Sequence, residues 1–116
     1  MGLNLSRRND IYLATSDRLM HYLGNGVMVL TDRATGFDDL FTDDEMIFYT
    51  DLDDLVSKAR HYASDNQARR KIAESGWTKA HDSFNEQLVA KYLMEATFEH
   101  AFSENYLWPV DIHKVS

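Results

Sequence analysis

The chain contains no cysteine, so it has neither a disulfide framework nor a thiolate metal site, and this fits a cytoplasmic location. It also lacks an apolar run of the roughly 20 residues that a membrane span needs. No basic-then-apolar signal peptide opens the sequence. The only proline is Pro109, in a segment that we expect to be an irregular tail over residues 103–116. A protein without a membrane span is therefore predicted.

Positive charge is also scarce, because 12 Lys and Arg residues stand against 19 Asp and Glu, giving a formal net charge of −7. Such a chain repels a phosphate backbone at long range. The basic residues cluster only at Arg7-Arg8 and at residues 69–71. One pair and one triplet do not form a surface that reads a nucleic-acid groove, so nucleic acid is not an expected partner.

Apolar patterning predicts one modest α/β domain, since 116 residues are too few for two. Short β-prone runs predict strands at residues 2–6, 27–30 and 46–50. The middle run, VMVL, is continuously apolar and should be buried on both faces. Helical spacing predicts a helix between the first two strands, and the FDDLF segment predicts one helical turn between the second and third. Three helices are expected after the last strand.

Capping residues set the expected helix boundaries. Thr15 or Ser16 can cap the first helix, with Asp17 in its first turn, and the turn at residues 24–26 should end it. The caps of the later helices are expected at Asp51, at Asp65 or Asn66, and at Asn85. Gly76 should break or bend the helix that contains it.

Strands separated by helices imply right-handed crossovers and a parallel sheet. About three strands is few for this architecture, in which ligands bind at the carboxyl ends of the strands. We therefore expect a partial Rossmann-like half-domain, and, because the sequence begins inside its first strand, a fragment or a half that a partner completes.

Several motifs occur in an order that resembles a known family. They are the run GLNLSR, the pattern Ser16-x-Arg18-x-x-His21 followed by Gly26-VMVLTD, and the segments DLDDL and NQARRKIAESGW. Together they resemble the C-terminal part of GT-B glycosyltransferases, and most closely the CgeB-like group, over residues 2–98. In that family this half binds a nucleotide-sugar donor and the other half binds the acceptor.

The resemblance implies that the helix starting near Ser16 points its N-terminus at the donor diphosphate. Backbone N–H groups and the helix dipole suit such an anion. The five histidines show no metal-ligand spacing, so neither a metal nor a cofactor is expected, and the nucleoside-diphosphate sugar would be a substrate. Related retaining enzymes carry a Glu at the position of His21, which contacts the ribose, and often a second Glu at the position of Leu13.

Each candidate binding residue has a structural alternative. Thr15 and Ser16 can bind phosphate, cap the helix, or do both. Arg18 can pair with the diphosphate or with a local carboxylate such as Asp17, and His21 can contact the ribose or solvent.

Two further candidates lie at the carboxyl ends of predicted strands. Arg7, with Arg8, can line the ligand edge or lie in a solvated loop. Asp32 can form a turn or contact sugar hydroxyls. The acidic groups at residues 38–39, 43–45 and 51–54 should cap helices and solvate loops rather than catalyse.

The leading hypothesis is that residues 1–102 form the donor-binding half-domain of a GT-B-type glycosyltransferase. The parent enzyme would transfer a hexosyl-type sugar, and the fragment would be inactive without an acceptor domain. The alternative is a non-catalytic interaction module that forms homo-oligomers or other complexes through the exposed edge of its incomplete sheet.

Overall fold

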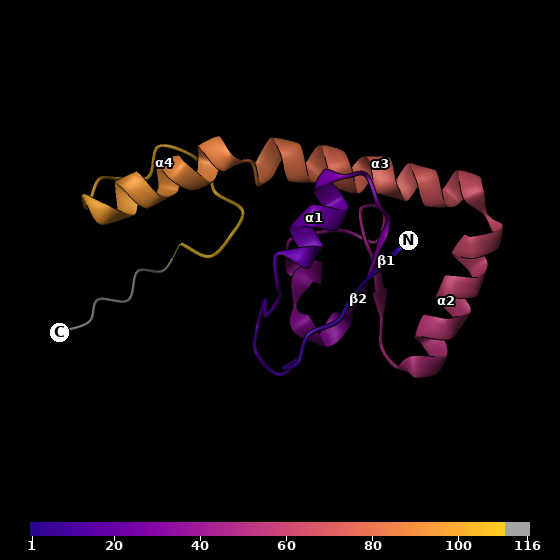
Figure 1. Cartoon of the computed structure of the whole chain (residues 1–116). Helices are drawn as coiled ribbons and strands as arrows, with labels where there is room; N and C mark the ends of the chain where they lie inside the picture. The colour runs from indigo at the N-terminus through magenta and orange to yellow at the C-terminus, as the bar shows by residue number, and fades with distance from the viewer. Residues whose placement is uncertain (111–116) are drawn as a thin grey trace.

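The computed structural model describes residues 1–110 and contains a three-stranded, fully parallel sheet (Figure 1). The strands are β1 (Gly2–Asn4), β2 (Val29–Asp32) and β3 (Ile47–Tyr49), in the order β1-β2-β3. Leu30 lies opposite Leu3 on one side and Ile47 on the other. The predicted α/β class and partial Rossmann-like arrangement are confirmed.

Helices cover both faces of this sheet. Successive side chains of a strand point to opposite faces, so Val29 packs against α1 (Arg18–Gly24), whereas Leu30 packs in the cluster that receives α2 (Leu52–Ser64). Val29 is fully buried and Leu30 is only 4% exposed. The predicted burial is confirmed for Met28, Val29 and Leu30, whereas Val27 is only partly buried.

The third helix, α3 (Asn66–Ser83), crosses the end of the sheet where the strands begin (Figure 1). The prediction that Gly76 breaks it is wrong, because α3 continues through that residue. A Cβ atom at Gly76 would lie 2.4 Å from the backbone oxygen of Glu45 and 3.1 Å from Leu23 Cδ2. Glycine is therefore needed for close helix packing and not for a bend.

The caps expected at Asp51, Asp65 and Asn85 are confirmed, since each side chain accepts a backbone N–H three residues later. The helix α1 begins one residue later than expected, after Asp17, whose side chain makes no capping hydrogen bond. Ser16 Oγ nevertheless accepts the N–H of Arg18, the first helical residue, over 3.4 Å. The Thr15 hydroxyl bonds instead to Asn4 at the end of β1.

Strand boundaries also differ from the prediction, and β2 starts at Val29 instead of residue 27. The reason lies in the turn after α1, where Asn25 follows the last helical residue and Gly26 has a φ of +70°. The Val27 N–H then donates to the Tyr22 carbonyl over 2.9 Å, so Val27 still belongs to this turn.

Two short 3₁₀ helices, η1 (Arg33–Thr35) and η2 (Phe37–Asp39), follow β2 and supply the predicted helical turn. The last helix, α4 (Glu86–Thr97), projects away from the sheet and accounts for a longest dimension of 50 Å (Figure 1). Residues 103–110 form no helix or strand, as expected, and residues 111–116 of the predicted tail lie outside the described residues. Within residues 1–110, no helix has both the length and the apolar character that crossing a membrane requires.

Candidate functional site

A cavity of about 540 Å³ opens where β1 ends and α1 begins, at the carboxyl edge of the sheet. Residues 5–8, which follow β1, line the cavity together with residues 14–16 and Arg18, which precede and open α1. Four of the predicted site residues therefore line the same cavity, namely Arg7, Thr15, Ser16 and Arg18. This is the edge at which open α/β sheets bind their ligands.

Three guanidinium groups give this cavity its charge. Arg8 forms a bidentate pair with Asp10, at 2.8 and 2.6 Å, and this hydrogen bonding lowers the pKa of the Asp10 carboxyl. Arg7 and Arg18 are exposed, and neither side chain pairs with a carboxylate among residues 1–110. Two unpaired cations beside a third paired one give this cavity a positive charge within an otherwise acidic protein.

The turn at Thr15 and Ser16 faces this cavity. The Thr15 hydroxyl donates toward Asn4 Oδ1, over 3.4 Å, and toward the Ser16 carbonyl, over 3.2 Å. Ser16 accepts the backbone N–H of Arg18 at its Oγ (3.4 Å) and that of Leu19 at its carbonyl (3.3 Å). Because these two amides are already bonded, the positive charge of the cavity comes mainly from the guanidinium groups.

His21 does not line the cavity. Its side chain is exposed on α1, and its carbonyl accepts hydrogen bonds from the backbone and side chain of Asn25 at 3.2 and 2.7 Å. It lies three residues after Arg18, which places the two side chains on the same face of the helix. His21 is thus about one helical turn away from Arg18 and from the cavity that Arg18 lines.

Asp32 does not line the cavity either. Its Oδ1 accepts the Ala34 N–H (2.9 Å) and caps η1, and its Oδ2 accepts the Asn9 side-chain amide (2.8 Å). Asp32 therefore forms a turn and fastens the loop that follows β1. Both of its oxygens have protein partners.

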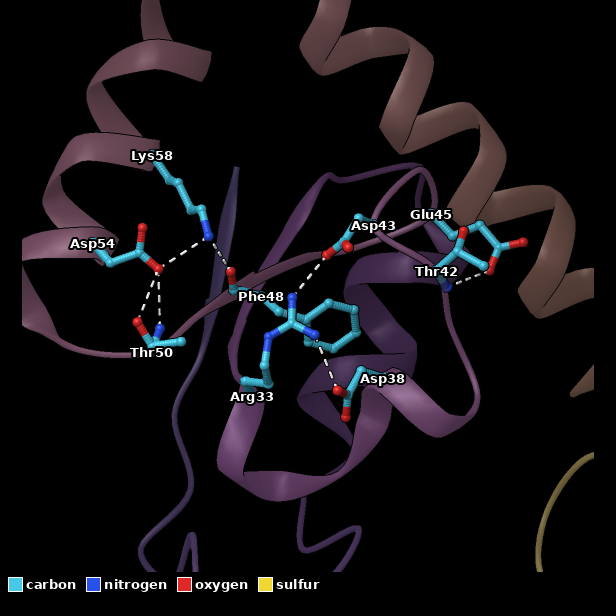
Figure 2. A network of polar contacts seen from close by, with 9 residues as sticks. All are labelled: Arg33, Asp38, Thr42, Asp43, Glu45, Phe48, Thr50, Asp54 and Lys58. Carbon is cyan, nitrogen blue, oxygen red and sulfur yellow. Dashed lines mark hydrogen bonds and ion pairs between the residues drawn. The ribbon is translucent and has the colours of Figure 1, made fainter.

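A separate polar network follows β2 and joins it to β3 (Figure 2). The Arg33 guanidinium lies 5.0 Å from the centre of the Phe48 ring and donates to Asp38 and Asp43, each over 3.0 Å. Because Arg33 is satisfied by these two carboxylates, it offers no free charge to a ligand. The acidic residues at 38 and 43 have a structural partner.

Two further carboxylates of the predicted acidic groups also have protein partners. Asp54 accepts from Lys58 and from the Thr50 backbone, both at 3.0 Å, and its pKa is lowered chiefly by the Lys58 hydrogen bond (Figure 2). Glu45 accepts the Thr42 N–H over 2.9 Å. In residues 1–110, no group of three or more His, Asp or Glu side chains is placed to hold a metal ion.

One buried polar pair beside the cavity was not among the predicted site residues. Asn4 Nδ2 donates to Thr31 Oγ1 over 3.1 Å, joining β1 to β2, and Asn4 also receives the Thr15 hydroxyl. Asn4 is 2% exposed and Thr31 is fully buried. The signal that could have found them is the polar residue at an inward-facing position of each strand.

Comparison with known proteins adds one finding. The model of a family described as glycosyl transferase-like matches residues 1–95, which include the sheet, the cavity and most of α4. No curated protein and no solved structure matches the chain.

Proposed function

The chain belongs to the glycosyl transferase-like family, and from this premise we propose that its cavity binds the diphosphate of a nucleotide-sugar donor. The observation that carries the proposal is the meeting of Arg7, Arg8 and Arg18 at one cavity on the carboxyl edge of a parallel sheet. A diphosphate has the charge and the oxygen acceptors that guanidinium groups bind best.

The chemistry of sugar transfer explains why such a site is useful. When the bond between the sugar and the diphosphate breaks, negative charge develops on the departing diphosphate. Cations fixed in advance around it stabilise this charge more in the transition state than in the ground state. Arg7 and Arg18 would supply this stabilisation, while the acceptor would be held by a second domain or chain.

The nucleoside would extend from the diphosphate along α1. His21 lies about 4.5 Å further along the helix axis than Arg18, by the rise of an α-helix, and on the same face. A neutral imidazole can make one hydrogen bond to a ribose hydroxyl through its free ring nitrogen, whereas a carboxylate can accept two. We therefore assign His21 a ribose contact that is weaker than a Glu would make.

Calorimetric titration of the chain with pyrophosphate, UDP and GDP tests this assignment at low and at physiological ionic strength. Arg18→Ala should weaken binding of all three ligands about tenfold, the effect of losing one charge-assisted hydrogen bond. The matched control is Arg70→Ala, an exposed arginine on α3 that lines a different cavity. Equal losses in both variants would mean that binding follows net charge and not this site.

His21 variants test the nucleoside contact separately. His21→Ala should weaken UDP or GDP and leave pyrophosphate unchanged, because pyrophosphate has no ribose. His21→Glu should strengthen the nucleotide selectively if the ribose lies there. A His21→Ala variant that binds both nucleotides like the wild type would remove His21 from the site.

A second candidate function, association through the sheet, is favoured by the state of β1. In the described part of the chain β1 pairs only with β2, so the backbone groups of Leu3 that point away from β2 are unpaired. Exposed Leu5 flanks this edge at 56% exposure, and an unpaired edge invites another strand. Light scattering should then show a dimer that Leu5→Lys converts to a monomer, and a wild-type chain that is monomeric would contradict this function.

A further inference from the structure

The buried pair beside the cavity connects three segments of the chain. Asn4 ends β1, Thr31 lies in β2, and Thr15 belongs to the turn before α1. The Asn4 amide group donates to Thr31 with its nitrogen and accepts from Thr15 with its oxygen. A buried amide must satisfy both ends, and here each end fixes a different neighbour.

The two hydroxyls in the turn have different hydrogen-bond roles. A hydroxyl has one proton to donate, and that of Thr15 is directed at Asn4 Oδ1 and at the Ser16 carbonyl. Thr15 therefore has no donor left for a phosphate oxygen. Ser16 Oγ accepts from the Arg18 N–H, so its own proton is free for a ligand.

We propose that Asn4 and Thr15 are positioning residues, which tie the turn to the sheet so that Ser16 and Arg18 face Arg7 across the cavity. The inference rests on the proposed anion site and reassigns Thr15 from ligand contact to support. Thr15 acts from within the turn, and Asn4 acts from the buried end of β1.

If Asn4 only stabilised the sheet, it would do so through its hydrogen bond to Thr31 and not through its bond to Thr15. Both hydroxyl residues can be replaced by valine with little change in shape, so the two bonds of Asn4 can be removed one at a time. Thr15→Val removes the bond to the turn, and Thr31→Val removes the bond between the strands. Thr15→Ser keeps the hydroxyl and should restore the positioning.

The test compares pyrophosphate affinity, by calorimetry, with stability, by urea unfolding, in these variants of the full chain. Thr15→Val should weaken pyrophosphate binding about threefold to tenfold, as expected for a lost hydrogen bond. Thr31→Val should keep the affinity within about twofold, while Thr15→Ser binds like the wild type. Each valine variant leaves one end of the buried Asn4 amide without its partner, so both should lower stability, and only Thr15→Val should also lower affinity. Wild-type affinity in Thr15→Val, or equal losses of affinity in Thr15→Val and Thr31→Val, would overturn the inference.

Amide hydrogen exchange separates this inference from the proposed function. Exchange at Arg18 and Leu19, whose N–H groups bond to Ser16, should accelerate in Thr15→Val and in Asn4→Val more than in Thr31→Val. A wild-type chain that does not bind pyrophosphate would refute the anion site, and this exchange pattern would still support the positioning role. Equal exchange rates in all three variants would refute the positioning role whatever the chain binds.

Discussion

Replacement of Gly76 by alanine tests how closely α3 packs against the end of the sheet. The added Cβ would lie 2.4 Å from the Glu45 backbone oxygen and 3.1 Å from a methyl carbon of Leu23. A backbone atom cannot rotate away as a side chain can, so α3 must shift outward. Overpacking of this kind costs about 1–3 kcal/mol, whereas alanine gains about 1 kcal/mol over glycine in a helix interior.

These two terms give Gly76→Ala a net loss of about 0–2 kcal/mol in the free energy of unfolding, and a stability about 1–3 kcal/mol below that of a helical Gly→Ala substitution without overpacking. Urea unfolding monitored by circular dichroism measures it directly. The matched control is Gly24→Ala at the end of α1, where no atom lies within 4 Å of the added Cβ, and this variant should be as stable as the wild type or more stable. If Gly76→Ala is as stable as Gly24→Ala, the close packing described here is wrong.

Three further predictions concern polar contacts away from the cavity. The pKa of Tyr106 is raised to about 12, first by desolvation and then by the hydrogen bond to Glu95. The stability that this contact contributes is therefore fully present below pH 10, and it is lost as the pH rises toward 12. Absorbance titration of tyrosine in wild type and Glu95→Gln should show one ionisation that moves to lower pH in the variant, and an unmoved titration would contradict the contact. Lys58→Met should raise the pKa of Asp54, because the ammonium is the main cause of its lowering, and an NMR titration of that carboxyl that matches the wild type would contradict this. Asp32→Ala removes the cap of η1 and should cost about 1 kcal/mol in urea unfolding, and unchanged stability would show that the cap contributes nothing.

The sheet could be predicted from sequence because its signals are local. A continuous apolar run such as VMVL is typical of a strand buried on both faces. The helix starts are marked by Asp51, Asp65 and Asn85, because each side chain accepts the backbone N–H three residues later. Gly76 shows the limit of local reasoning. Its role depends on close packing against a backbone oxygen 31 residues earlier in the chain. Helix propensity carries no information about such a contact.

The candidate site was predictable in part for the same reason. The rule that ligands bind at the carboxyl edge predicted Arg7, and the helix start with the family resemblance predicted Arg18; the two line the same cavity although the chain separates them. The bond between Asn4 and Thr31 was not predictable, since it requires the strand register as well as the identity of each residue. The partners of Arg33 were equally hidden, because the loops that carry Asp38 and Asp43 give no periodic signal.

The measurement that tests the central claim most directly is an NMR titration of the isotope-labelled chain with UDP at low ionic strength. Binding at the cavity predicts the largest amide shifts in residues 5–8 and 14–18, and predicts that Arg18→Ala reduces them while Arg70→Ala does not. Shifts centred instead on the cavity near Arg69 and Arg70, or no saturable shifts at all, would contradict the assignment of this edge as the donor site.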